Sequence, residues 1–468
     1  MARLSKLMTA STFAVAIAAG SARAFAVGPT AFVETQTLRI NNPGPVDDLG
    51  YSLGTGGGSL IAGAINVRSD AGSDVGAAYV YRQDAGGQWI EDAVLKPSDG
   101  GHNDAFGWAS DVFGDSAIVG VPYHDALGDS SGAAYLFADQ GDDGWQQIAK
   151  LVPADGDDSE LFGLAVAMTE TTAAVGAFRH QDSPAPGTRL EKGAVYLYEQ
   201  VGPLIWAPSI KLQPSDVKFG DRFGYSLDLF GDTLAATSAS AQNAGTDWRG
   251  AVYIYQNDGA AWLQADKIVP SGSPGTAFFG QQLSLGDGRL LVGASGLASS
   301  GARGSAYIYE ENEFGEWVQA AELTPHDIDQ RWYFGIEVSL SGDTAAVVAY
   351  SSPSGAIDPV VYLFEYDGLG GWQETATLTS AEAAHSFGFA LASQEDQIFV
   401  GSGVNSAGAV HVFSRVPEPR ALLWQSGALI GFFFKSAGAR SRFGKEKGHA
   451  VHSVTAARAA RGNDAGAN

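Results

Sequence analysis

The 468-residue chain contains no cysteine, which excludes disulfide bonds, thiolate metal ligands and a cysteine nucleophile. It is also poor in basic residues: Lys and Arg number 28 against 52 Asp and Glu, which gives a formal net charge of -24. Because phosphate binding requires positive charge, this balance excludes nucleic acid as a partner. The basic residues are concentrated near the two ends, so the stretch between them is more acidic than the average.

Long apolar runs are rare, and two of them lie at the ends. Arg3 and Lys6 precede an apolar stretch over residues 7–19, and small residues suited to cleavage follow, so we interpret residues 1–26 as a signal peptide. Residues 416–419 (VPEP) precede a second apolar stretch, over residues 421–434, and a basic cluster that ends at Lys447. This second stretch is shorter than the roughly 20 residues of a full membrane span. We expect residues 448–468 to be a disordered tail.

Between these ends the chain is a repeat array. The strand-like string GAAYLF at residues 132–137 recurs, with small changes, to give seven copies in all; the others begin at Ala77, Ala194, Ala251, Ser305, Val360 and Ala409. The spacing of roughly 50 to 60 residues is typical of solenoids and propellers.

Each repeat has the same internal order. A Phe-Gly pair opens it, as at Phe106-Gly107, and a Gly-Asp pair between two apolar runs follows, as at Gly114-Asp115, where a tight hairpin turn is expected. The tyrosine string comes next, and then a tryptophan, as at Trp145. The order predicts four short strands per unit. The other openers are Phe162, Phe223, Phe279, Phe334 and Phe387, with Leu49-Gly50 as a degenerate first member.

The third strand of each unit is apolar on both sides, for example AVYLY at residues 194–198. A strand with one wet face would alternate, so these sheets must be covered on both faces by their neighbours. A ring of stacked sheets satisfies this condition, whereas an open stack leaves two bare ends. The sequence therefore predicts an all-β, seven-bladed β-propeller of four-stranded antiparallel blades.

The two ends of the array predict how the ring closes. The last unit stops after its third strand at Phe413, whereas residues 36–40 precede the first unit without a partner. Leu38 fits the series of apolar residues that end the fourth strands, such as Leu95 and Leu151. We therefore expect the N-terminal strand to complete the last blade.

The Phe-Gly openers, the Val-Gly-Ala strings at residues 175–177 and 292–294, and the strand GAAYVY at residues 76–81 together resemble the FG-GAP repeats of integrin-α-like β-propellers, in their bacterial form. The resemblance covers residues 35–415. The segment 416–447 resembles a PEP-CTERM sorting signal. These resemblances imply an exported scaffold for adhesion or partner binding at the cell surface or in the extracellular matrix of a Gram-negative-type bacterium, with transient anchoring in the inner membrane.

The candidate binding surface lies on the connections between blades. In a propeller, these connections emerge on the same face as the loops between second and third strands, and loops on a rigid scaffold commonly carry recognition. Three consecutive connections are acidic and supply the candidate ligand face: Asp99, Asp104, Asp155, Asp157, Asp158, Asp216 and Asp221. The alternative is that these acids only keep the ring soluble.

Other motifs favour ordinary structural roles. Residues 50–54 match the G-x-S-x-G nucleophile motif, which requires a strand-to-helix turn, but they occupy the opener of the first repeat. We expect His102, His124, His180, His326 and His385 to be surface residues of loops. No metal or other cofactor is expected. Calcium remains an open alternative in the loops at residues 69–74, 124–129 and 242–247, although their acids and amides are better explained as turn caps.

We therefore expect a non-catalytic scaffold, a monomeric ring whose partner is an extracellular glycan or a surface protein. Two alternatives stay open. One is a polysaccharide-active propeller enzyme, a glycosidase or lyase, which would use converging carboxylates. The other is a calcium-dependent adhesion module.

Overall fold

The structure is a computed structural model that describes residues 30–41, 43–68, 72–181, 191–240, 250–270, 278–296, 301–350, 359–380, 386–403 and 406–417. The predicted signal peptide falls outside these ranges, as does the predicted sorting segment beyond Pro417, together with the tail. Within the described ranges, no helix has the length and apolar character needed to cross a bilayer.

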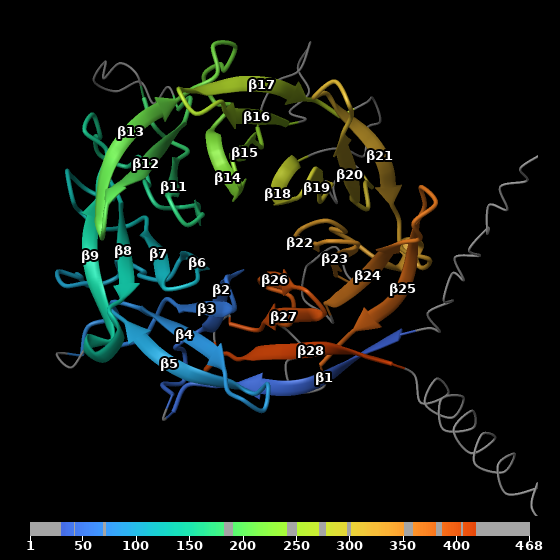
Figure 1. The fold of residues 1–468 in the computed structure, drawn as a ribbon, viewed down its shortest axis with the longest axis horizontal. Helices are drawn as coiled ribbons and strands as arrows, with labels where there is room; N and C mark the ends of the chain where they lie inside the picture. Colours follow the sequence, from blue (N-terminus) through green and yellow to red (C-terminus); the bar gives the residue numbers. More distant parts are fainter. Residues whose placement is uncertain are drawn as a thin grey trace, which may run out of the picture. The chain divides into compact units, whose positions relative to one another are not determined.

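Residues 30–416 form a compact unit of seven four-stranded sheets. Figure 1 shows the sheets arranged as blades around a central axis, which confirms the predicted seven-bladed propeller. Each of the first six blades uses four strands that are consecutive in the sequence.

The blades are composed as follows: blade 1, β2 (Leu49–Gly56), β3 (Ser59–Ala64), β4 (Ala77–Gln83) and β5 (Trp89–Leu95); blade 2, β6 (Ala109–Phe113), β7 (Ser116–Val121), β8 (Ala133–Asp139) and β9 (Trp145–Leu151); blade 3, β10 (Val166–Met168), β11 (Thr172–Ala177), β12 (Ala194–Gly202) and β13 (Ile205–Leu212); blade 4, β14 (Phe223–Phe230), β15 (Thr233–Ser238), β16 (Ala251–Asn257) and β17 (Trp262–Ile268); blade 5, β18 (Phe279–Gly286), β19 (Arg289–Ala294), β20 (Ser305–Glu311) and β21 (Trp317–Leu323); blade 6, β22 (Val338–Ser341), β23 (Thr344–Ala349), β24 (Val360–Tyr366) and β25 (Trp372–Leu378); and blade 7, β26 (Leu391–Gln394), β27 (Gln397–Gly401), β28 (Val410–Pro417) and β1 (Thr30–Leu38).

The N-terminal strand β1 pairs with β28 and forms the outer strand of blade 7, as predicted. It spans residues 30–38 rather than 36–40, because the long partner β28 offers pairing along eight residues. Leu38 is buried between blades 7 and 1, with Leu49, Trp89 and Phe399. The side-chain amide of Gln36 donates to the carbonyl oxygen of Trp89 (2.6 Å) and accepts from its N–H (2.9 Å), so β1 also fastens blade 7 to blade 1.

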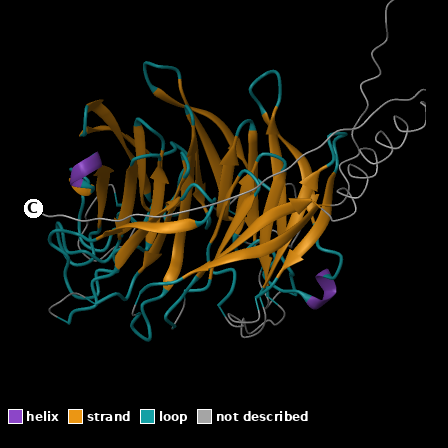
Figure 2. Cartoon of the chain, turned by 60° about the horizontal axis from the view of Figure 1, so that its bottom comes forward, coloured by secondary structure: helices purple, strands orange, loops and turns teal. Residues whose placement is uncertain are grey.

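Short turns and longer loops lie at opposite ends of the blades. The Gly-Asp pairs form two-residue turns, as between Phe113 and Ser116, where Gly114 has a positive φ of 58°. The connections between blades lie at the opposite end, beside the loops that join second and third strands. A hydrogen bond links the two kinds of loop: the N–H of Phe106 donates to the carbonyl of Val75 (2.9 Å). We call this end the loop face and the end with the two-residue turns the turn face; Figure 2 shows both sets of loops.

Aromatic packing explains why each unit opens with phenylalanine. Phe106 is fully buried, and its ring centroid lies 5.8 Å from that of Tyr135 and 5.9 Å from that of Phe137 on the third strand of blade 2. The other phenylalanine openers repeat this packing. The third strands are buried on both faces, as predicted, so each sheet depends on its neighbours for its core.

Glycines let neighbouring blades approach through their backbones. A Cβ atom placed on Gly120 of β7 would lie 2.0 Å from the carbonyl oxygen of Gly163, the opener glycine of the next blade. Gly293 and Gly335 meet at the same distance between blades 5 and 6. The Phe-Gly and Val-Gly-Ala strings are therefore the two sides of one inter-blade contact, which leaves no space for a side chain.

Candidate functional site

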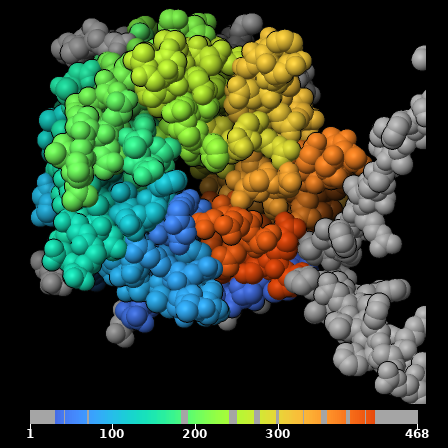
Figure 3. Space-filling view, in the orientation of Figure 1, coloured from blue at the N-terminus to red at the C-terminus, as the bar shows by residue number. Residues whose placement is uncertain are grey.

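The inner strands enclose a central channel with a volume of about 1440 Å³, visible as the hollow at the centre of the ring in Figure 3. Its lining includes residues from both ends of the inner strands, so it follows the ring axis. The residue directly after each opener glycine lines the channel near the loop face; these seven residues are Tyr51, Trp108, Leu164, Tyr225, Gln281, Ile336 and Phe389. The fold thus brings seven equivalent positions of the repeat to one opening.

Aromatic side chains dominate this opening. We define the aromatic collar as Tyr51, Trp108, Tyr123, Tyr225, Tyr350 and Phe389, which line the channel and are half-buried or exposed. The ring centroid of Tyr51 lies 5.0 Å from that of Trp108 and 4.8 Å from that of Phe389, and Trp108 in turn contacts Tyr123 at 5.3 Å. Tyr123 is 37% exposed. The blades are already packed through their opener phenylalanines, so the collar is additional apolar surface that faces water.

Eight carboxyl groups line the channel. Five are exposed side chains in the two-residue turns at the turn face, and three, those of Asp111, Asp228 and Glu337, lie on the inner wall below the collar. Asp111 of β6 accepts the N–H of Met168 on the inner strand of blade 3 (2.8 Å), and Asp228 of β14 accepts the N–H of Leu285 in blade 5 in the same way (2.8 Å). Glu337, just before β22, accepts from the backbone of blade 7. Each of these three carboxyls therefore satisfies a donor on the exposed edge of the next inner strand.

Burial raises the pKa of the three inner-wall carboxyls. The pKa of Asp111 rises to about 8, with a further contribution from the charge of Asp228, whose own pKa rises to about 6. Burial likewise raises the pKa of Glu337 to about 8. These shifts favour the protonated forms of Asp111 and Glu337, so these two groups contribute less negative charge to the channel than two free carboxylates would.

Two of the predicted site residues are turn caps. Asp104 accepts the backbone N–H of Gly101 (2.6 Å), and Asp221 accepts that of Lys218 (2.9 Å). Both side chains are buried, and Glu160 is buried at the equivalent place in the connection between them. These carboxylates shape the connection that delivers the next opener, and they are not part of the exposed acidic surface.

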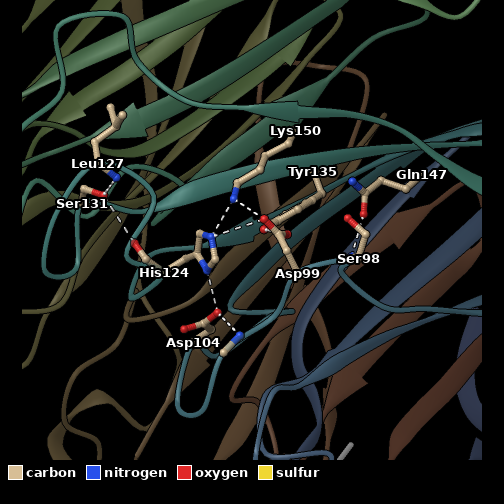
Figure 4. Close-up of polar contacts among 10 residues, drawn as sticks. Ser98, Asp99, Asp104, His124, Leu127, Ser131, Tyr135, Gln147 and Lys150 are labelled. Carbon is tan, nitrogen blue, oxygen red and sulfur yellow. Dashed lines mark hydrogen bonds and ion pairs between the residues drawn. The ribbon is translucent and has the colours of Figure 1, made fainter.

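Asp99, Asp155 and Asp216 occupy equivalent places in the three connections. Each accepts a hydrogen bond from the first tyrosine of a third strand and pairs with a lysine of the fourth strand. For Asp99 the partners are Tyr135 (2.7 Å) and Lys150 (2.6 Å), shown in Figure 4. Although partial burial opposes it, these two donors hold the pKa of Asp99 below its usual range. The same chemistry lowers the pKa of Asp155 and of Asp216.

Asp157 and Asp158 are exposed in the connection between blades 2 and 3. Asp158 accepts the N–H of Asp129 (3.1 Å), which ties this connection to the neighbouring loop. The seven predicted residues thus lie on the loop face in three separate connections. Three of them pair with tyrosine and lysine side chains, two cap buried turns, and Asp157 and Asp158 accept only backbone N–H groups. Among the described residues, no three Asp, Glu, His or Cys side chains gather closely enough to hold a metal ion.

The expectation that the loop histidines are surface residues is wrong for two of them. His124 is nearly buried between Asp104 (Nδ1 to Oδ2, 2.7 Å) and Lys150 (Nε2 to Nζ, 2.7 Å), as Figure 4 shows. His180 has the same environment in blade 3. Because lysine only donates, Nε2 accepts and the imidazole proton lies on Nδ1. Among the rest, His102 and His326 are exposed, and His385 lies outside the described residues.

The remaining motifs have structural contacts. Ser52 of the G-x-S-x-G string lies within β2, donates to the carbonyl of Gly107 (2.9 Å) and contacts Ser110 (2.7 Å), so no strand-to-helix turn presents it. In the loop at residues 124–129, Asp125 accepts the N–H of Ser130 (2.8 Å), as expected of a turn cap. The loop at residues 242–247 and part of that at residues 69–74 lie outside the described residues.

Sequence reasoning did not single out the collar or the channel carboxyls. A signal was present for both: four of the seven residues that follow the opener glycines are aromatic. An aspartate also lies within each of two inner strands that carry no other charged residue, at Asp111 and Asp228.

Comparison with protein families finds one match. A family model described as FG-GAP repeat matches residues 89–137, 145–198, 206–255, 262–309 and 317–364, which together make up more than half of the chain. Each match begins at an outer-strand tryptophan and ends in the third strand of the following blade.

No curated protein sequence matches the chain. Among solved structures, one similar chain is that of the "Crystal Structure of Mitotic Checkpoint Complex", with 10% sequence identity and a TM-score of 0.49. The alignment covers 87% of this chain and 99% of that one.

Proposed function

Because this chain belongs to the FG-GAP repeat family, we propose that it is an exported, non-catalytic scaffold for adhesion or partner binding, with the loop face as its recognition surface. The aromatic collar is the observation that carries this proposal. Aromatic rings at a concave opening, with polar groups below them, are typical of ligand sites, and blade packing does not require them.

The proposal places the protein at the cell surface or in the extracellular matrix of a Gram-negative-type bacterium. The basic and apolar segments at residues 1–26 support export, and the VPEP string with its apolar and basic continuation supports sorting through transient contact with the inner membrane. A cysteine-free, strongly acidic ring suits such a location, because it has no thiol to oxidise and stays soluble. An extracellular glycan or a surface protein is the proposed partner.

Two measurements test the proposal. Fractionation of native cells with an antibody against the ring should find it outside the inner membrane, with Met1 and the first residues removed. The purified full-length protein should also bind isolated matrix, and the double variant Tyr51→Ala/Phe389→Ala should lose that binding. Leu369→Ala is the matched control, because this side chain is 92% exposed on the turn face. Equal binding by both variants would contradict the assignment of the loop face.

A polysaccharide-active enzyme is the second candidate, and the channel carboxyls favour it. Asp111 and Asp228 have raised and different pKa values, as an acid and base pair requires. Both oxygens of each group, however, accept backbone N–H groups, which gives the pair a structural role. Release of reducing ends from matrix polysaccharide, abolished in Asp228→Asn, would replace the scaffold proposal with this one.

A further inference from the structure

We propose that the aromatic collar binds a neutral saccharide chain, which enters the channel mouth and stacks its sugar rings on Tyr51, Trp108 and Phe389. This inference rests on the proposed binding function and specifies its ligand. Three features of the channel mouth support a sugar: its aromatic surface, its uncharged polar groups and its size.

The aromatic surface has the form that a sugar ring requires. Tyr51 contacts Trp108 and Phe389 at interplanar angles of 52° and 48°, so the three rings are tilted and form a faceted wall instead of a closed stack. All three remain partly open to solvent. A pyranose ring presents an apolar face of C–H groups, which this wall can cover, while its hydroxyl groups stay free to form hydrogen bonds.

The polar groups around the wall include uncharged hydroxyl and amide groups, together with the side chains of Arg179 and Glu337. Ser52, Gln281 and Gln282 line the channel beside the collar and are partly exposed. Burial raises the pKa of the Tyr51 hydroxyl well above its usual range and also raises that of Tyr225, so both phenols stay protonated. Neutral hydroxyls, amides and protonated carboxyls both donate and accept hydrogen bonds, which matches the hydroxyl groups of a sugar.

Size and charge narrow the ligand class further. A channel of about 1440 Å³ exceeds the roughly 300–1,000 Å³ of a typical small-molecule pocket, so it has room for several linked sugar rings. The acidic ring would repel a uronic acid polymer, which favours a neutral chain. A single lysine or arginine side chain of a protein partner would fill only a small part of the space.

The test is a titration of the full-length protein with neutral oligosaccharides. Hexasaccharides of the gluco, manno and galacto series are added while tryptophan fluorescence and calorimetric heat are recorded, in parallel with an oligogalacturonate and a lysine-rich peptide. We expect saturable binding of at least one neutral series, with a Kd that is unchanged between 50 mM and 500 mM salt because no charge is paired. Trp108→Ala should weaken it about tenfold or more, whereas Trp108→Phe should retain most of it.

Tyr123→Ala is the second collar variant, chosen because this partly exposed side chain can be removed without disturbing a blade core, and Phe314→Ala on the turn face is the matched control. Binding of the lysine-rich peptide alone, in a salt-dependent manner, would overturn the saccharide inference and leave the scaffold function standing. If no probe binds while collar substitutions still abolish attachment to matrix, the saccharide inference is likewise overturned and the scaffold function stands. Attachment to matrix that ignores the collar would instead overturn the proposed function itself.

Discussion

Removing the side chain of Leu38 should destabilise the whole ring, because this residue seals the junction between its two ends. Leu38 is 5% exposed and packs with residues of blades 7 and 1. Truncation of a buried leucine to alanine costs about 2–5 kcal/mol, and since an outer strand can partly relax, we expect about 2–4 kcal/mol for Leu38→Ala. Dividing this loss of free energy by the unfolding entropy of a ring of this length gives a fall in Tm of about 2–5 °C.

Val33→Ala provides the control on the same strand. Val33 is 41% exposed, so its truncation should change the free energy of unfolding by about 0.5 kcal/mol or less. Equilibrium urea denaturation followed by tryptophan fluorescence measures both variants, because Trp89 lies beside Leu38 in the same core cluster. If the two variants lose equal stability, β1 does not close the ring and the inferred junction is wrong.

Three further predictions concern other parts of the ring. The pKa of Glu337 is raised to about 8, so between about pH 4.5 and 8 the native state holds a proton that the unfolded state has lost. The free energy of unfolding should therefore fall as pH rises through this window, by up to about 1.4 kcal/mol per pH unit. Urea denaturation at several pH values should show a smaller slope for Glu337→Gln. Gly293→Ala should lower Tm sharply in calorimetry, because its Cβ would meet a backbone oxygen at 2.0 Å, whereas Gly202→Ala, with neighbours at 3.6 Å or more, should be tolerated; similar losses would refute the close approach. Asp104→Ala should cost about 1.5–3 kcal/mol in urea denaturation because it unpairs a buried turn and His124, whereas the exposed Asp157→Ala should stay within about 0.5 kcal/mol; equal costs would mean that Asp104 is not a structural carboxylate.

The fold could be predicted from the sequence because the same physical requirement recurs in every unit. A third strand that is apolar on both faces needs a neighbour on each side, and Leu38 is recognisable as the missing member of a series that ends each fourth strand. A short apolar run by itself can be a strand or part of a helix. Repetition removes this ambiguity, because seven copies of a unit must all adopt one structure. The bounds of β1 were less predictable, since its partner strand determines where it begins.

The candidate site was harder to predict because it depends on pairings across the sequence. The acidity of the connections is visible in the chain, but nothing in it shows that Lys150 lies against Asp99, or that His124 is buried on Asp104. The collar combines side chains from five blades, and only the ring places them at one opening. Comparison of the repeats therefore predicts the structure that all units share, whereas the candidate site depends on residues that differ between the units.

The pairing of β1 with β28 has a consequence for how the protein is held. The described chain enters the ring at Thr30 and leaves it at Pro417 on two neighbouring strands of one sheet. An attachment through either terminus would therefore hold the ring by the outer edge of blade 7. Both ends of the ring therefore belong to blade 7, and the other six blades carry no chain terminus.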